Sequence, residues 1–156
     1  MNLATLMTDL AVCNAEVKVN NVVTKTSLGL SSIQMGFLSD LNVQDEIFPL
    51  CLVAPPDGEL AVQDEVNIDH LDIYIVALDH SPTEGKYTPS ERQAVWDTLK
   101  VIGRTLLVRL MALNTQGVPK YQVTSKVTYE RDYGDDLAQP CIWMKFKLTV
   151  KTADCV

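Results

Sequence analysis

The sequence of 156 residues is 47% hydrophobic and 21% charged, which is typical of one globular domain and excludes a disordered chain. Its formal net charge of −7 argues against nonspecific binding to nucleic acid by neutralisation of phosphates. The N-terminus has no basic region followed by an apolar run, and no stretch approaches the about 18 continuous apolar residues of a membrane span. We therefore expect a protein that is made and used in a cytoplasm, or that leaves it by a route other than secretion, and no membrane partner.

The first expected element is a short amphipathic helix over residues 2–15, with Asn2 as its cap. Its apolar residues recur at helical spacing, so they share one face and should pack on the core of the domain. They are Leu3, Leu6, Met7, Leu10 and Cys13. Residues 16–25 follow, with four valines around Asn20-Asn21, and predict a strand or a small hairpin.

Residues 27–44 leave two interpretations open. Ile33, Met35 and Phe37 occupy alternate positions, which allows a strand. The same segment can instead be an extended arm or loop that docks on a neighbouring molecule. The sequence does not decide between these two structures.

Two central strands and a long helix are expected next. The runs 47–53 and 71–78 are largely apolar, as expected for strands in the middle of a sheet. Residues 88–113 begin with Thr-Pro-Ser-Glu, in which Thr88 can cap a helix and Glu91 completes a capping box. Behind this start, apolar residues recur at steps of three and four, so the helix has one apolar face that must be covered. They are Val95, Leu99, Ile102, Leu106, Leu110 and Leu113. The flanking stretches have strand patterns, so we expect a sheet to cover it.

The last part of the chain has the strongest strand signal. Residues 121–130 and 142–150 alternate between apolar and polar side chains, so each strand should have one buried and one solvated face. The connection 131–140 combines acidic residues with glycine and proline and is expected to project as an exposed acidic loop. Trp143 lies on the otherwise polar face, where it is either a partner contact or a single exposed aromatic residue.

The order of these elements predicts a single α+β domain over residues 1–156. We expect a mixed, mainly antiparallel sheet of four to six strands. The N-terminal helix and the long helix should pack on one face of this sheet, and a β-hairpin should form its C-terminal part. The polar face of that hairpin is left for solvent or for a partner.

No constellation of residues points to catalysis, to a cofactor or to a metal. The four cysteines are far apart, so reduced and mostly buried thiols are expected rather than a zinc site. Asp69-His70 and Asp79-His80 stand at opposite ends of a strand of about 25 Å, so one metal ion cannot bind both, and solvated strand ends explain them better. Nucleophile elbows, phosphate loops and dinucleotide-binding turns are absent. We expect a protein that is not an enzyme; an unrecognised hydrolase at these Asp and His residues is the alternative.

Charge is unevenly distributed along the chain. Residues 57–97 hold ten acidic residues against Lys86 and Arg92, and the rest is close to neutral. An acidic region and a basic stripe on one subunit suit head-to-tail contacts between identical subunits, and a merely solvated surface explains the same pattern. The basic stripe lies along the long helix, off its apolar face, and consists of Lys100, Arg104 and Arg109.

A succession of features runs through the second half of the chain. It comprises Phe48-Pro49 before an apolar strand, a strand ending near Leu78, an early Trp96 in the next helix, Tyr-Glu-Arg-Asp-Tyr-Gly-Asp-Asp at 129–136, and the alternating strand at 142–150. This succession resembles the tail terminator proteins of long-tailed bacteriophages, of the lambda type, and related tail-completion and neck proteins. The resemblance covers Phe48-Pro49 and about residues 71–150.

Such a resemblance implies a hexameric ring of identical subunits, each with a mixed sheet and helices on one side. The ring would cap the tail tube at its set length, stop further polymerisation and offer a surface to the head-side connector. Its implied partners are the tail tube protein and neck or connector proteins, with DNA passing through the channel without specific binding. Its implied location is the virion, after assembly in the host cytoplasm. Two alternatives are a neck-completion protein one tier up and a non-viral protein-binding module.

The residues expected to carry this role fall into two groups. An acidic loop with Asp132, Asp135 and Asp136 would line the channel, because like charge prevents the adhesion of DNA. The assembly contacts are expected on the polar face of the last hairpin and on the basic stripe. They are Trp143, Lys145, Lys147, Lys100, Arg104 and Arg109.

Overall fold

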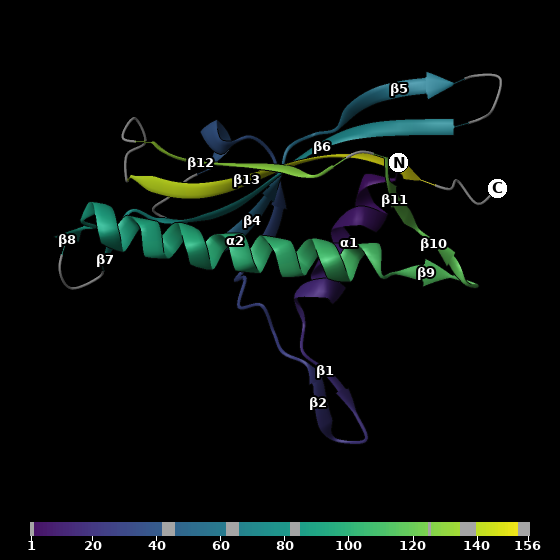
Figure 1. The fold of residues 1–156 in the computed structure, drawn as a ribbon, viewed down its shortest axis with the longest axis horizontal. Helices are drawn as coiled ribbons and strands as arrows, with labels where there is room; N and C mark the ends of the chain where they lie inside the picture. The colour runs from purple at the N-terminus through teal and green to yellow at the C-terminus, as the bar shows by residue number, and fades with distance from the viewer. Residues whose placement is uncertain are drawn as a thin grey trace.

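The computed structural model describes residues 2–41, 46–61, 66–81, 85–124, 126–134 and 140–152. In this part of the chain, two α-helices lie on one face of a seven-stranded, mainly antiparallel sheet (Figure 1). The α+β fold class expected from the sequence is therefore confirmed, with its N-terminal helix, its long helix and its pair of C-terminal strands.

The centre of the sheet is a long antiparallel pair, β6 (Val66–Leu78) and β13 (Cys141–Thr152). β4 (Leu50–Val53) pairs antiparallel with the second half of β6. β3 (Ile33–Met35) then pairs with β4 in the one parallel pairing among the described strands. Of the two interpretations of residues 27–44, the strand is thus correct for its middle, and a short 3₁₀ turn (Leu38–Asp40) follows.

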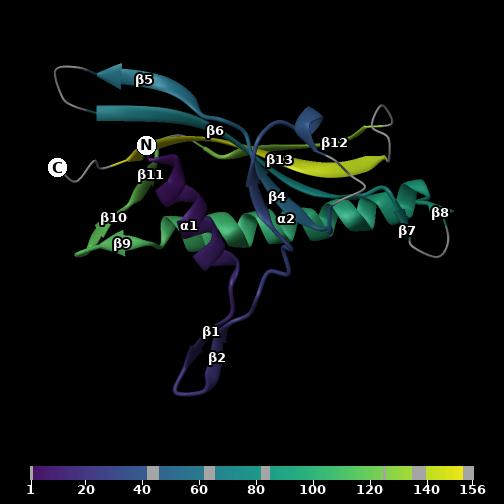
Figure 2. The same ribbon diagram turned by 180° about the vertical axis from the view of Figure 1, so that it is seen from behind.

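Both long strands carry two short strands in succession on their outer edges (Figure 2). β5 (Asp57–Ala61) pairs with the first half of β6, next to β4, and was not expected from the sequence. β11 (Tyr121–Val123) and β12 (Thr128–Gly134) share the free edge of β13. Across its width the sheet therefore has five strand positions, in the order β11-β13-β6-β4-β3, with β12 beside β13 and β5 beside β6.

The strand expected at 121–130 is interrupted, and this interruption shapes the surface. From Val123 to Thr128 the chain advances five residues, while the partner strand advances only three, from Val150 to Lys147. Two residues more on one strand than on its partner break the ladder, as in a β-bulge. After the break, β12 continues to Gly134, so the first part of the expected loop 131–140 is strand instead.

α2 (Pro89–Met111) is the long helix expected from the sequence, and its cap at Thr88 is confirmed. The Thr88 hydroxyl accepts a hydrogen bond from the Glu91 amide at 3.3 Å and donates one to the Glu91 carboxylate at 2.8 Å. The predicted apolar face is buried or packed on the core along its length. Gly103 and Leu107 are also buried, which the apolar spacing did not indicate.

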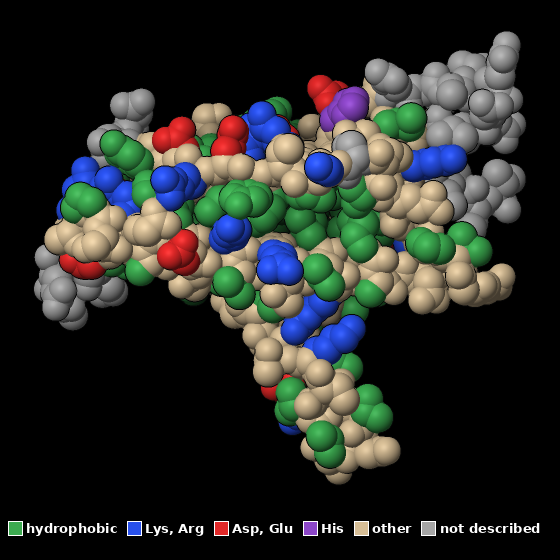
Figure 3. Space-filling view, in the orientation of Figure 1, with side chains coloured by type: hydrophobic (Ala, Val, Ile, Leu, Met, Phe, Trp, Pro, Cys, Tyr) green, Lys and Arg blue, Asp and Glu red, His purple; other side chains and the backbone are tan. Residues whose placement is uncertain are grey.

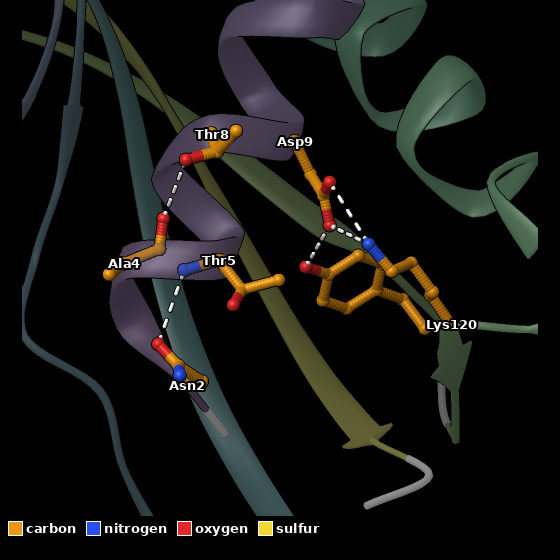
Figure 4. A network of polar contacts seen from close by, with 7 residues as sticks. Asn2, Ala4, Thr5, Thr8, Asp9 and Lys120 are labelled. Atoms are coloured by element: carbon orange, nitrogen blue, oxygen red, sulfur yellow. Dashed lines mark hydrogen bonds and ion pairs between the residues drawn. The ribbon is translucent and has the colours of Figure 1, made fainter. Parts of the chain in front are cut away.

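α1 (Leu3–Asn14) packs beside α2 and is capped by Asn2, whose side chain accepts from the Thr5 amide at 3.2 Å. Figure 4 shows how α1 is tied to the start of β11. The Asp9 carboxylate accepts from the Lys120 ammonium at 3.0 Å and from the Tyr121 hydroxyl at 2.7 Å. Burial and the bond to Asp9 raise the pKa of the Tyr121 hydroxyl, so it stays a donor.

The core lies between the helices and one face of the sheet. It takes the alternate residues of β13 that were predicted to be buried, namely Ile142, Met144, Phe146, Leu148 and Val150. Cys13, Cys51 and Cys141 are buried and are not in a disulfide, as expected, whereas Cys155 lies outside the described residues. Burial raises the pKa of Cys51 to about 12 and, with the Asp79 charge, that of Cys141 to about 11.

Replacing Gly103 with alanine tests the packing of α2 on β13. A methyl group at this position would overlap the buried Phe146 ring. We expect Gly103→Ala to lower the free energy of unfolding by about 1–3 kcal/mol, because overpacking outweighs the gain in helix propensity of about 1 kcal/mol. Urea denaturation measures it, with the exposed Val101→Ala as control. Equal or greater stability of Gly103→Ala would mean that Phe146 does not lie against the helix.

Candidate assembly surface

A small hairpin projects from the body of the molecule, away from the sheet (Figure 1). It consists of β1 (Val17–Val19) and β2 (Val22–Lys25), which in the described part of the chain pair only with each other. Asn20 and Asn21 have φ angles of 51° and 64°, as a two-residue type I′ turn requires, and asparagine tolerates this conformation better than most residues. The hairpin alternative predicted for residues 16–25 is therefore correct.

The hairpin exposes apolar side chains near its tip. Val19 is 54% exposed, Val22 63% and Val23 44%. Val19 and Val22 are opposite each other in the ladder, so their side chains share one face of the ribbon. The valines were recognised in the sequence only as a strand signal. The asparagine turn at 20–21 indicates a hairpin, but nothing local indicates that the hairpin leaves the core.

Several hydrogen bonds hold the root of the hairpin. The Asn14 side chain donates to the Leu30 carbonyl at 3.0 Å and accepts from the Leu30 amide at 3.2 Å. Arg109 Nη1 donates to the Cys13 carbonyl at 3.0 Å and to the Thr26 carbonyl at 2.8 Å. These bonds set the direction in which the hairpin leaves the body. They also make the half-buried Arg109, one of the expected assembly contacts, a support of the hairpin.

An apolar groove lies between α2 and the edge formed by β11 and β12, and Figure 3 shows its hydrophobic surface facing the viewer. Its volume is about 390 Å³. It lies beside the interruption between β11 and β12, because Val123 and Val127 on either side of that interruption line it. The lining consists of Leu107, Val108, Met111, Val123, Val127, Tyr129 and Phe146, with Lys100 and Arg104 as its cations.

At the groove and beyond it, α2 and β12 are joined by cations that lie over aromatic rings. The Lys100 ammonium lies 4.4 Å from the centre of the Tyr129 ring, and the Arg92 guanidinium 4.3 Å from that of Tyr133. Through a hydrogen bond and its charge, Lys100 lowers the pKa of the exposed Tyr129 hydroxyl. Two basic residues of the predicted stripe, Lys100 and Arg104, are therefore brought together at one groove, and Arg109 is not.

Lys145 and Lys147 lie on the opposite face of the sheet from α2. Lys145 forms ion pairs with Asp72 at 3.3 Å and with Glu130 at 3.6 Å, and Lys147 pairs with Glu130 at 3.7 Å. Burial alone would lower the pKa of Lys145, but Tyr74 and Asp72 outweigh it and raise this pKa. The charge of Lys145 is thus already compensated within the chain.

Trp143 is not on a wholly solvated face. It is half-buried and packs with a second apolar cluster on the side of the sheet opposite the helices. Leu38 and Phe48, which lie close to β3 and β4 in the sequence, pack on the same cluster. The sequence pattern of β13 alone cannot show that Trp143 is partly covered, because the covering residues are distant in the sequence. The expected polar face is therefore polar only at its other end, near Lys145 and Lys147.

The expected acidic loop is only partly described. Asp132 lies in β12 rather than in a loop, is exposed, and accepts a hydrogen bond from the Tyr133 amide at 2.8 Å. Its backbone carbonyl accepts from the Trp96 indole at 3.2 Å. Asp135 and Asp136 lie outside the described residues.

Asp79 was expected to be a solvated residue at a strand end, and this expectation is wrong. Its side chain is fully buried and forms a bidentate ion pair with Arg92, with Nε–Oδ1 at 3.0 Å and Nη2–Oδ2 at 2.8 Å. The pair joins the end of β6 to the first turn of α2. The local sequence could not reveal a partner 13 residues away on another element.

Among the described residues, no His, Cys, Asp or Glu side chains are grouped as a metal ion would require. None of the described helices is long and apolar enough to cross a bilayer. No family model and no curated protein sequence matches the chain. The hairpin, the groove and its basic rim are therefore the features from which a function can be argued.

Asp79→Asn tests the buried ion pair. The substitution removes the charge of the fully buried Asp79 carboxylate from its bidentate pair with Arg92, which should cost about 3–5 kcal/mol of the free energy of unfolding. The exposed Asp97→Asn on α2 is the matched control and should change stability by less than about 0.5 kcal/mol. Chemical denaturation measures both variants. A loss for Asp79→Asn as small as that of the control would show that the pair does not support the junction.

Proposed function

We propose that this chain is a structural subunit of a bacteriophage tail. In this role it assembles into a hexameric ring that caps the tail tube and joins it to the head-side neck. The observation that carries the proposal is the architecture: a mixed, mainly antiparallel sheet with both described helices on one face, closed by an alternating strand. This is the fold implied by the resemblance of the second half of the chain to tail terminator proteins.

The surface supports a role in assembly. One side of the molecule carries a projecting hairpin with exposed valines, and another carries an apolar groove rimmed by Lys100 and Arg104. Contiguous exposed apolar surface on a globular protein is typical of sites where other proteins bind. Two unlike surfaces on one subunit suit head-to-tail contacts, which close into a ring when the rotation between neighbours permits it.

The charge supports a channel that DNA can pass through. The net charge is −7, and Asp132 is exposed on β12, close in sequence to Asp135 and Asp136. A channel lined by carboxylates repels phosphates, so DNA slides without adhering. In this function the chain acts by binding copies of itself, the tube protein and the neck, and needs neither cofactor nor metal.

Tube growth in the presence of the purified chain tests the proposal. We expect ring-shaped particles by negative-stain electron microscopy, and tubes of the cognate tail tube protein that stop growing and carry a ring at one end. A cap binds only tube ends, so far fewer copies than tube subunits should suffice. Tubes that grow to the same length with and without the chain would contradict the capping role. Rings that bind the isolated connector and do not bind the tubes would favour the alternative role as a neck-completion protein.

A further inference from the structure

We infer that the β1–β2 hairpin of one copy docks in the apolar groove between α2 and β11–β12 of a second copy. The inference rests on the proposed function, because it takes the ring of identical subunits as given and identifies the two surfaces that meet. It makes the hairpin the inserting element and the groove the receptor. The contact then repeats from each subunit to the next.

The hairpin has the properties of an element that inserts into a partner. An isolated two-stranded hairpin is only marginally stable in water, and this one exposes valines instead of burying them. Its direction is nevertheless set by the bonds of Asn14 and Arg109 at its root. A segment held in one direction loses little conformational entropy on binding, so it is preorganised for a contact.

The groove has the properties of a receptor for that tip. Its floor is formed by aliphatic and aromatic side chains, and its volume of about 390 Å³ falls in the range of about 300–1,000 Å³ of sites that enclose small ligands. Val19 and Val22 offer apolar groups for the floor. Lys100 and Arg104 at the rim have donors but no acceptors, and the unpaired backbone carbonyls on the edges of a projecting hairpin are acceptors.

The two surfaces cannot meet within one molecule. In Figure 3 the groove opens between α2 and β12, whereas the hairpin extends from the other side of α2. Each copy therefore offers one hairpin and one empty receptor, which is the definition of a heterologous contact. A hairpin tip is small beside a standard interface of about 1,200–2,000 Å², so a single contact should be weak and ring closure should strengthen it.

Single substitutions that place a charge in either surface test the contact. We expect Val22→Asp in the hairpin and Val108→Asp in the groove each to weaken self-association about tenfold or more. Val22, Val108 and the control position Val101 are all exposed, so none of the three variants should unfold. Val101 is on α2 like Val108, with 65% and 61% exposure, but does not line the groove, so Val101→Asp should assemble as the wild type does. Sedimentation velocity over a concentration series measures the association.

Mixing the two defective variants distinguishes this contact from others. Val22→Asp keeps an intact groove and Val108→Asp an intact hairpin, so the mixture should form one-to-one dimers and nothing larger, at concentrations high enough to populate a single contact without ring closure. Two variants that fail alone and also fail together at these concentrations would show that hairpin and groove bind something other than each other. A wild-type protein that assembles while both variants assemble equally well would overturn the docking and leave the ring standing. A wild type that stays monomeric at every concentration would overturn the ring as well.

Discussion

The antiparallel ladder between β6 and β13 determines which side chains face the helices. Residues 67–78 pair one to one with residues 141–152, so this register decides, along both strands, which side chains lie on each face of the sheet. Phe146 and Ile73, which are partners in this ladder, both lie in the core under α2. A slip of one residue in this pairing would move every such side chain to the other face and expose the apolar faces of the helices that pack on them. Helix packing thus favours this one register, and this register in turn places the apolar side chains on which the helices pack.

The surfaces available for assembly follow from this ladder. Because β6 occupies one whole edge of β13, both β11 and β12 must share the other edge, and their two-residue mismatch interrupts it beside α2. The groove lies beside that interruption. The hairpin is fixed from the same core, since Arg109 of α2 binds the carbonyls of Cys13 and Thr26 on either side of it. A body that carries an oriented projection and a separate receptor is suited to repeated head-to-tail contacts.

Local sequence patterns predicted the helices, strands and turns, whereas contacts between distant residues determine the burial and the partners of their side chains. The cap at Thr88, the alternation of 142–150 and the asparagine turn at 20–21 are set by residues close in sequence, and the structure confirms all three. Asp79 was assigned to the surface and is fully buried, and Arg109 and Trp143, expected as exposed residues, are half-buried and contact distant parts of the same chain. Their partners lie on other elements, so no periodicity could indicate them. The interruption between β11 and β12 was missed for the same reason, since it exists only relative to β13.

The most direct test of head-to-tail docking is a disulfide between hairpin and groove in a Val22→Cys/Val108→Cys variant. Cys13, Cys51 and Cys141 are buried with raised pKa values and should stay reduced, and Cys155→Ser removes the remaining thiol. A disulfide forms only when the two Cα atoms come within about 7 Å, which docking in a second copy allows. Oxidation should then give a ladder of covalent oligomers that ends at the hexameric ring. Only monomers, or the same ladder from a Val22→Cys/Val101→Cys control, would contradict the account.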